Sequence, residues 1–205
     1  MRARKTGTET RQEQIVKAAL EIIGTEGVAA LSISGIAARV GIVPSAIYRH
    51  FRGKDAVLDA ILEYIRTRVM GNVELVREEA GEGPERLRLL LQRHVRMLHE
   101  IRIIPYILFS DGILAGQPEW REKVKAIMTA YIGEIRQLIR EGIEEGSIRQ
   151  DLDQLTAALM FLGMIIPAAV FSNIADKSFD LVAHAEKVWP AYHEHITAHK
   201  RESLS

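Results

Sequence analysis

The sequence predicts an all-α protein of about nine helices. Apolar residues recur three and four positions apart along most of the chain, the spacing that gives a helix one apolar face. No stretch alternates apolar and polar residues as a half-buried strand does, and no segment repeats another. Glycine and proline separate the periodic segments, so the helices can be placed in order along the chain.

The composition is that of an intracellular protein whose 205 residues suffice for one or two domains with a real core. The chain contains no cysteine, which excludes a disulfide framework, a thiolate nucleophile and a cysteine metal site. Its N-terminus is basic but is not followed by an apolar run, so it does not read as a secretory signal. We therefore expect a cytoplasmic protein.

The net charge of zero hides an asymmetry along the sequence. Residues 1–54 contain nine Lys/Arg and four Asp/Glu, a net charge of +5, whereas residues 55–205 contain eighteen and twenty-three, a net charge of −5. A basic head on an acidic body suits a protein whose head alone meets a polyanion. We therefore expect two domains with these bounds, residues 1–54 and residues 55–205.

Three helices are predicted in the basic head. The first begins with the capping box Thr10–Glu13 and ends near Gly27. Ser32 is a good N-cap for a second, short helix, and Gly41 follows where the chain must reverse in a left-handed conformation. Pro44 suits the first turn of a third helix, where its missing N–H is not needed. Two short helices joined by a glycine turn are the pattern of a helix-turn-helix, whose second helix enters the DNA major groove.

A run of four residues, Tyr-Arg-His-Phe at positions 48–51, is followed by Lys54, a combination that a generic helix-turn-helix has no reason to carry. The same region also contains Ile15, Ala18, Ala19 and Gly27 in the first helix, and Ile36, Ala37, Gly41, Ile47 and Leu58 around the turn. In these residues, over roughly the first 60 positions, the chain resembles the tetracycline-repressor (TetR) family of transcriptional regulators. A weaker likeness falls on residues 141–151.

The resemblance implies an all-α homodimer with an N-terminal three-helix DNA-binding domain and a C-terminal helical domain for ligand binding and dimerisation. The residues expected to contact DNA are Ser32, Pro44, Ser45, Ala46, Tyr48, Arg49 and Lys54. Lys54 and the N–H groups of the helix it begins are expected to face one phosphate, whereas Arg49 reads a guanine or contacts a phosphate. Val43 stands where the family commonly has a small hydroxyl residue, so the third helix lacks its usual cap. Arg2, Arg4 and Lys5 form a basic arm that either contacts DNA or has no role.

The body is predicted to contain four helical segments before its apolar stretch and its last helix. A long fourth helix starts at about residue 54, and residues 81–84 mark a break. Helical spacing then returns between residues 87 and 98 and between residues 120 and 138, while residues 102–116 are interrupted by proline and glycine and should form short, irregular helix.

Residues 155–175 carry no charge over twenty-one positions, which is long enough to span a bilayer. Pro167 near the middle and the absence of a flanking Lys/Arg cluster favour a buried helix instead, and we expect no contact with a membrane. This helix, capped by Asp153, and a last helix from about Asp180 should pair with the same two helices of a second copy. The interface residues expected are Leu159, Met160, Leu162, Ile166, Val170, Val188 and Tyr192.

Several apolar and polar side chains of the body are candidates to line an effector pocket, although each also fits an ordinary core. They are His94, Met97, Leu108, Phe109, Asp111, Met128, Tyr131, Phe161 and Met164. Their mostly apolar character favours a hydrophobic or amphipathic effector. His195 and His199 have the spacing of metal ligands but lack a third ligand of clear geometry, so we expect no metal ion and no cofactor.

The family resemblance implies a ligand-responsive transcriptional regulator, most simply a repressor, that binds a near-palindromic operator as a homodimer and is released by its effector. The sequence has no nucleophile elbow and no phosphate loop, so no enzyme activity is expected. Two alternatives stay open: a small all-helical enzyme or carrier with a vestigial DNA-binding head, and an effector-free regulator switched by a protein partner.

Overall fold

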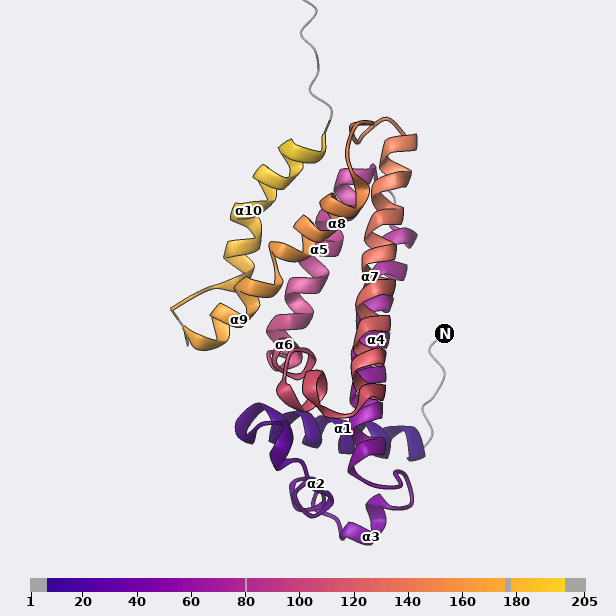
Figure 1. The fold of residues 1–205 in the computed structure, drawn as a ribbon, viewed down its shortest axis with the longest axis vertical. Helices are drawn as coiled ribbons and strands as arrows, with labels where there is room; N and C mark the ends of the chain where they lie inside the picture. Colours follow the sequence, from indigo (N-terminus) through magenta and orange to yellow (C-terminus); the bar gives the residue numbers. More distant parts are fainter. Residues whose placement is uncertain (1–6, 80, 176–177, 198–205) are drawn as a thin grey trace, which may run out of the picture. The chain divides into compact units, whose positions relative to one another are not determined.

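The computed structural model describes residues 7–79, 81–175 and 178–197, and within these ranges the chain forms ten α helices, two short helical turns and no β strand (Figure 1). The predicted all-α fold class is confirmed.

The chain divides into two compact units. Unit 1 comprises residues up to 66 together with residues 106–124, and unit 2 comprises residues 67–105 and those from 125 onward. The division therefore does not follow the boundary expected after residue 54, because the long helices α4 and α7 each contribute residues to both units.

Unit 1 contains α1 (Gly7–Glu26), η1 (Val28–Ala30), α2 (Ile33–Val40), α3 (Pro44–Ile47), the start of α4 (Lys54–Glu78), most of α6 (Ile104–Leu108), the π-helical turn η2 (Gly112–Gly116) and the first turns of α7 (Pro118–Glu144). Unit 2 contains the rest of α4 and α7, with α5 (Gly83–Glu100), α8 (Gln154–Gly163), α9 (Ile166–Ile174) and α10 (Leu181–Ile196).

The first helix begins earlier than the sequence suggested. α1 starts at Gly7, so the prediction that Thr10 is its N-cap was wrong. Threonine and glutamate are both tolerated inside helices, so a helix can continue upstream of Thr10. Its predicted end is confirmed, because Gly27 follows the last helical residue and adopts a left-handed φ of 85°.

The helix-turn-helix forms as its caps predict. The N–H of Gly35 donates to Ser32 Oγ at 3.1 Å, which caps α2, and Gly41 closes the helix in the left-handed conformation with φ 76°. The unit is held by a small apolar core of fully buried side chains contributed by α1, α2, α3 and α4. Its members include Ile15, Ala19, Ile36, Ala37, Ile47, Val57, Leu58 and Ile61.

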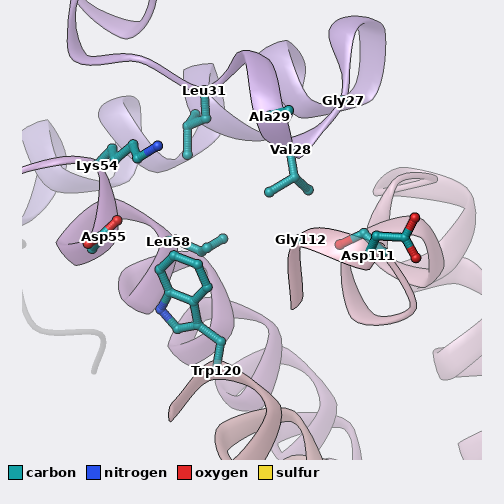
Figure 2. A pocket seen from close by; sticks show the side chains of 11 residues that line it. Gly27, Val28, Ala29, Leu31, Lys54, Asp55, Leu58, Asp111, Gly112 and Trp120 are labelled. Atoms are coloured by element: carbon teal, nitrogen blue, oxygen red, sulfur yellow. The ribbon is translucent and has the colours of Figure 1, made fainter. Parts of the chain in front are cut away.

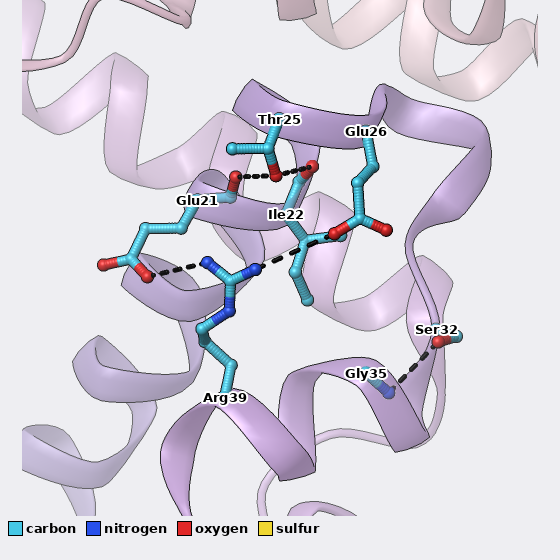
Figure 3. Close-up of polar contacts among 7 residues, drawn as sticks. All are labelled: Glu21, Ile22, Thr25, Glu26, Ser32, Gly35 and Arg39. Carbon is cyan, nitrogen blue, oxygen red and sulfur yellow. Dashed lines mark hydrogen bonds and ion pairs between the residues drawn. The ribbon is translucent and has the colours of Figure 1, made fainter.

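One arginine ties the two packed helices α1 and α2 together at the surface. Arg39 Nη1 lies 3.3 Å from Glu21 Oε2, and its Nη2 lies 3.7 Å from Glu26 Oε1 (Figure 3). These side chains are exposed, so each pair contributes only about 0–1 kcal/mol. The orientation of α2 therefore depends mainly on the buried residues beneath it.

The apolar stretch of the body is two helices rather than the single helix predicted. α8 ends at Gly163 and α9 begins at Ile166, and Pro167 lies in the first turn of α9. Proline has no N–H to bond the carbonyl of the residue four positions earlier, and its ring clashes with that carbonyl, so the helix breaks just before it. This extra break accounts for ten helices where about nine were expected.

The predicted starts of the apolar helix and of the last helix, at Asp153 and Asp180, are confirmed. Asp153 Oδ1 accepts from the N–H of Thr156 at 2.7 Å and caps α8, and Asp180 Oδ1 caps α10 by accepting from the N–H groups of Val182 and Ala183. By length and composition residues 154–174 are apolar enough to cross a membrane, but 39% of that window is buried within the chain.

Two glycines allow α5 and α7 to approach closely in unit 2. A Cβ placed on Gly83 would lie 2.6 Å from the Cα of Gly142, far inside van der Waals contact. Both residues are buried, and the contact involves backbone atoms that cannot move aside. The remaining core of unit 2 is aliphatic and aromatic, and includes Leu87, Leu91, Val95, Ile135, Leu138 and Phe161.

Candidate nucleic-acid interface

The short helix α3 presents its outer side chains to solvent. It begins at Pro44 after Val43, whose side chain makes no cap hydrogen bond, as the missing hydroxyl predicted. Ile47 is fully buried beneath α3. Of the predicted contact residues on this segment, Ser45 and Arg49 are exposed and Ala46 is half-buried.

A surface groove of about 560 Å³ brings together four of the seven predicted DNA-contact residues: Ser32, Pro44, Tyr48 and Lys54. It is lined by Leu31, Ser32, Ile33, Ser34, Pro44, Tyr48, Arg52, Gly53 and Lys54. These residues come from the start of α2, the start and end of α3, and the start of α4. The side chain of Tyr48 is 58% exposed, an unusual position for a large aromatic ring in a protein without a partner.

The Ser32 hydroxyl in this groove can still donate a hydrogen bond. Its oxygen accepts from the N–H of Gly35, and the hydroxyl of Ser34 lies 3.5 Å away. Because a hydroxyl both accepts and donates, Ser32 can cap α2 and still donate its own O–H to an anion.

Two cations, Arg52 and Lys54, line the groove, and a third, Arg49, lies just after α3 in the sequence. Among the described residues, Arg49, Arg52 and Lys54 are exposed and form no ion pair. Lys54 is also the first residue of the 25-residue helix α4, whose first N–H groups have no intrahelical acceptor. Concentrated positive charge beside free backbone donors is the arrangement that binds phosphate.

Arg52 was missed by the sequence reasoning. It follows the motif residue Phe51, which is buried, and it lines the groove alongside Lys54. The available signal was the spacing of the three basic residues at positions 49, 52 and 54, which no acidic residue interrupts. The basic arm of Arg2, Arg4 and Lys5 lies outside the described residues, and so does His199.

The nine residues expected to line an effector pocket divide between the two units. Leu108, Phe109 and Asp111 belong to unit 1, where Leu108 is buried and the other two are exposed. The other six belong to unit 2: His94, Met97, Tyr131 and Phe161 are buried, and Met128 and Met164 are half-buried.

His94 and Tyr131 form a buried polar pair in unit 2. Nδ1 of His94 lies 2.7 Å from the Tyr131 hydroxyl, and the two rings are 5.2 Å apart. Burial lowers the pKa of His94 to about 4 and raises the pKa of Tyr131 well above its ordinary value. At neutral pH both groups are therefore uncharged hydrogen-bonding groups inside an apolar core.

The seven residues expected at a dimer interface also differ in exposure. Leu159 and Met160 on α8 are 50% and 42% exposed, and Ile166, Val170 and Val188 are half-buried. Leu162 and Tyr192 are instead buried in the chain's own core, where the Tyr192 hydroxyl donates to the carbonyl of Ala157 at 3.0 Å. These two side chains therefore offer little surface to a second copy.

Additional apolar side chains on the same three helices are exposed. They are Leu155, Phe171, Ile174 and Val182, of which Ile174 is 68% exposed. Together with Leu159 and Met160 they make up the exposed apolar set of α8, α9 and α10. Exposed apolar residues gathered on neighbouring helices mark an interaction surface rather than ordinary solvent-facing side chains.

Comparison with known proteins matches two family models to this chain. Residues 15–61 match the model described as bacterial regulatory proteins, tetR family, and residues 80–169 match a tetracyclin repressor-like C-terminal domain. A relative from Bacillus subtilis, a fatty acid metabolism regulator protein, is 27% identical over 178 residues, which cover 85% of this chain and 90% of the relative.

Two solved structures are similar over nearly the whole chain. The fatty acid degradation regulator FadR from Bacillus halodurans has a TM-score of 0.80 at 24% identity, covering 93% of this chain and 97% of its own. The regulator FadR from Bacillus subtilis, solved in complex with stearoyl-CoA, has a TM-score of 0.76 at 26% identity, covering 88% of this chain and 96% of its own.

Proposed function

We propose that this chain, which belongs to the TetR family of bacterial transcriptional regulators, binds a near-palindromic operator as a homodimer and releases it when unit 2 binds an acyl-CoA. The proposed output is repression, because DNA would be vacated when the effector is present.

The observation that carries the proposal is the groove beside α3. The groove brings together the start of α4, the hydroxyl of Ser32 and two cations, Arg52 and Lys54, that form no ion pair among the described residues. Phosphate contacts of this kind fix the position of a protein on DNA, and the outer residues of α3 then reach base edges. Ser45, Ala46 and Arg49 are the proposed base-reading positions, with Arg49 suited to guanine.

Selection from a random duplex pool tests this part directly. We expect the protein to enrich a near-palindromic site whose half-sites lie about one helical turn apart, or a multiple of it. Ala46→Gln should change which sequence is enriched, whereas Lys54→Ala should weaken binding to every sequence about equally. A pool that shows no enrichment with the wild-type protein would refute the assignment.

The proposed dimer uses the exposed apolar set of α8, α9 and α10. A two-fold contact places the same patch of each copy against the other, so one apolar surface suffices to build it. Dimerisation would bury side chains such as Leu159 and Ile174, at roughly 25 cal/mol for each Å² of apolar surface removed from water. It would also set the spacing of the two α3 helices that the operator must match.

The proposed effector is an acyl-CoA. The Bacillus subtilis FadR, 26% identical to this chain, was solved with stearoyl-CoA, and the unit 2 core contains the apolar residues that an acyl chain needs. His94 and Tyr131 are neutral donors and acceptors within that core, and they would orient the polar end of the chain by hydrogen bonds. The proposed lining in unit 2 is thus His94, Met97, Met128, Tyr131, Phe161 and Met164.

Release of DNA requires that the acyl-CoA bind the DNA-incompetent form more tightly. We expect stearoyl-CoA to lower operator affinity by about 5- to 150-fold, and operator DNA to lower stearoyl-CoA affinity by the same factor. Met128→Trp should fill space beside the proposed lining and abolish the response, while Met70→Trp, a matched change at a half-buried position of α4 outside the lining, should not. Operator affinity that is unchanged by stearoyl-CoA would favour the alternative of a regulator switched by a protein partner.

A further inference from the structure

A second pocket, smaller than the groove beside α3, lies within unit 1. Its volume is about 360 Å³, at the lower end of the range for small-molecule sites. It is lined by residues of η1, the first turns of α4, the turn before η2 and the start of α7 (Figure 2). All of its lining residues belong to unit 1, so the pocket is formed by that unit alone.

The walls of this pocket are apolar. Val28 and Leu31 face Leu58 and the indole ring of Trp120 across the open space (Figure 2). Leu31 and Leu58 are buried, whereas Val28 and Trp120 are only half-buried. A small ring or a short branched chain placed between them would therefore remove further apolar surface from water.

The charged residues that line the pocket are one cation, Lys54, and two carboxylates, Asp55 and Asp111. Lys54 lies at one side without an ion pair among the described residues, whereas the neighbouring Asp55 accepts a hydrogen bond from Gln117 Nε2 at 3.4 Å. The carboxylate of Asp111, on the opposite side, points away from the space (Figure 2). Lys54 is thus the one cation among the lining residues, and it is the group that a ligand anion would meet.

The wall beside η2 is formed by an uncommon backbone element. Gly112 opens a π-helical turn, a rare element that often marks functional sites. A Cβ at Gly112 would lie 3.1 Å from Cγ1 of Val28, so a larger residue here would require the Val28 side chain to shift by a few tenths of an ångström. The pocket therefore depends on the close approach of two segments far apart in the sequence.

The pocket shares two lining residues with the DNA-facing groove. Leu31 and Lys54 line both of them. A ligand anion that pairs with Lys54 would compete with a DNA phosphate for the same ammonium group, because one lysine cannot neutralise both fully.

We propose that this pocket binds a small aromatic monocarboxylate, with its ring between Val28, Leu58 and Trp120 and its carboxylate on Lys54, and that binding weakens the hold on DNA. The effect on DNA rests on the proposed function, whereas ligand binding does not. The site would make the regulator responsive to a second class of molecule, distinct from the acyl-CoA proposed for unit 2.

Three probes of nearly equal size test the charge preference: phenylacetate, neutral phenylacetamide and cationic 2-phenylethylamine. Binding is followed by the indole N–H resonances of the two tryptophans, where Trp120 lines the pocket and Trp189 of unit 2 serves as an internal control. We expect phenylacetate to shift the Trp120 resonance saturably, with a dissociation constant on the order of 1 mM, and to leave Trp189 unmoved. The amide should bind more weakly and the amine not at all.

Two substitutions separate the ring contact from the charge contact. Lys54→Gln should weaken phenylacetate binding about tenfold and leave phenylacetamide binding within about twofold, because it removes a charge-assisted hydrogen bond. Lys17→Gln, an equivalent change at an exposed lysine of α1 that does not line the pocket, should change neither. Ala29→Trp should block all probes by filling the space while preserving the circular dichroism spectrum.

The effect on DNA is measured separately, with a labelled operator duplex. Phenylacetate should lower operator affinity for the wild-type protein and leave it unchanged for Ala29→Trp. Equal binding of the amide and the carboxylate, equal shifts of both tryptophans, or no Trp120 shift at about ten times the expected dissociation constant would overturn the site. Because the resonance experiment contains no DNA, a protein that failed to bind an operator would refute the proposed function and leave this test intact.

Discussion

The cations beside α3 and those of unit 2 differ in whether they form ion pairs within the chain. In unit 2, five arginines pair with glutamates of other segments: Arg68 with Glu100, Arg77 with Glu134, Arg86 with Glu145, Arg88 with Glu186 and Arg93 with Glu79. Beside α3, Arg49, Arg52 and Lys54 have no such partner among the described residues. Charges already neutralised within the chain stabilise it locally, whereas unpaired charges in a groove are available to a polyanion.

The two regions also differ in which apolar side chains they expose. Unit 2 leaves the aliphatic side chains of Leu159, Met160 and Ile174 substantially exposed, whereas the large apolar side chains exposed around α3 are Val43 and Tyr48, which flank that helix. The surface beside α3 therefore offers cations to an anionic partner, and the exposed apolar set of unit 2 offers a surface to an apolar partner. Unpaired cations in one region and exposed apolar side chains in the other are both consistent with the proposed dimer that binds DNA.

The largest expected effect comes from placing a charge in the exposed apolar set of α8, α9 and α10. Leu159→Lys should dissociate the proposed dimer, because a charge cannot be buried unpaired at a two-fold contact. Light scattering should report a fall from twice the 23.0 kDa chain mass to the chain mass itself. Operator affinity should fall about 10³-fold, towards the non-specific level. Thr156→Lys, an exposed polar position on the same helix, should remain dimeric, and a wild-type protein that is already monomeric would contradict the proposal.

The next effect sharpens the contrast between the solvated cations of unit 1 and the dry interior of unit 2. The pKa of His94 is about 4 in the folded protein, below its ordinary 6.5, so the unfolded chain binds more protons between these pH values. Its contribution to stability is therefore complete above about pH 6.5 and is lost as the pH falls towards 4. We expect the free energy of unfolding in urea to fall by about 2 kcal/mol between pH 7 and pH 5. His94→Gln should show a shallower dependence, and equal slopes for the two proteins would rule out this role.

Disturbing the close packing of α5 on α7 should lower the stability of unit 2 by a similar amount. Gly83→Ala should destabilise the protein by about 2 kcal/mol, because the new methyl group meets the backbone of Gly142. The same substitution at Gly133, where a Cβ meets no atom within 4 Å, should stabilise the protein by about 0.5 kcal/mol. Thermal unfolding measures the stability of both variants. If the helices pack as described, Gly83→Ala must unfold at a lower temperature than Gly133→Ala.

The smallest effect lies in unit 1. Ser32→Ala removes the cap of α2 and should cost about 1 kcal/mol of stability, while Ser34→Ala, which leaves the bond to Gly35 intact, should cost much less. Ser32→Asp should restore most of the loss, since a carboxylate also caps a helix. Chemical denaturation of the three variants distinguishes a capping role from a general sensitivity of this turn.

The contrast also explains which features the sequence could predict. The residues proposed to contact DNA lie within one short segment. Its caps and turn, Ser32, Gly41 and Pro44, act on their immediate neighbours, so local chemistry was enough to predict the two helices that carry these residues. The break between α8 and α9 was missed although Pro167 had been noticed, because the long apolar run around it suggested one continuous helix.

Tertiary packing decided what local patterns could not. Tyr192 looks like an interface residue in sequence, but its hydroxyl finds the carbonyl of Ala157, 35 residues away, and its ring is buried. Similarly, Leu108, Phe109 and Asp111 follow α5 closely in sequence but belong to unit 1. Membership of a core or pocket depends on contacts between distant segments, which periodicity alone does not specify.

The central claim is that the unpaired cations beside α3 neutralise DNA phosphates, and the salt dependence of operator binding tests it most directly. A plot of log affinity against log salt should be steep for the wild-type protein, and Lys54→Ala should reduce its slope by about 1. Arg88→Ala, which removes an arginine already paired with Glu186 in unit 2, should leave the slope unchanged. A flat dependence for the wild-type protein, or equal changes in slope for the two variants, would contradict the account.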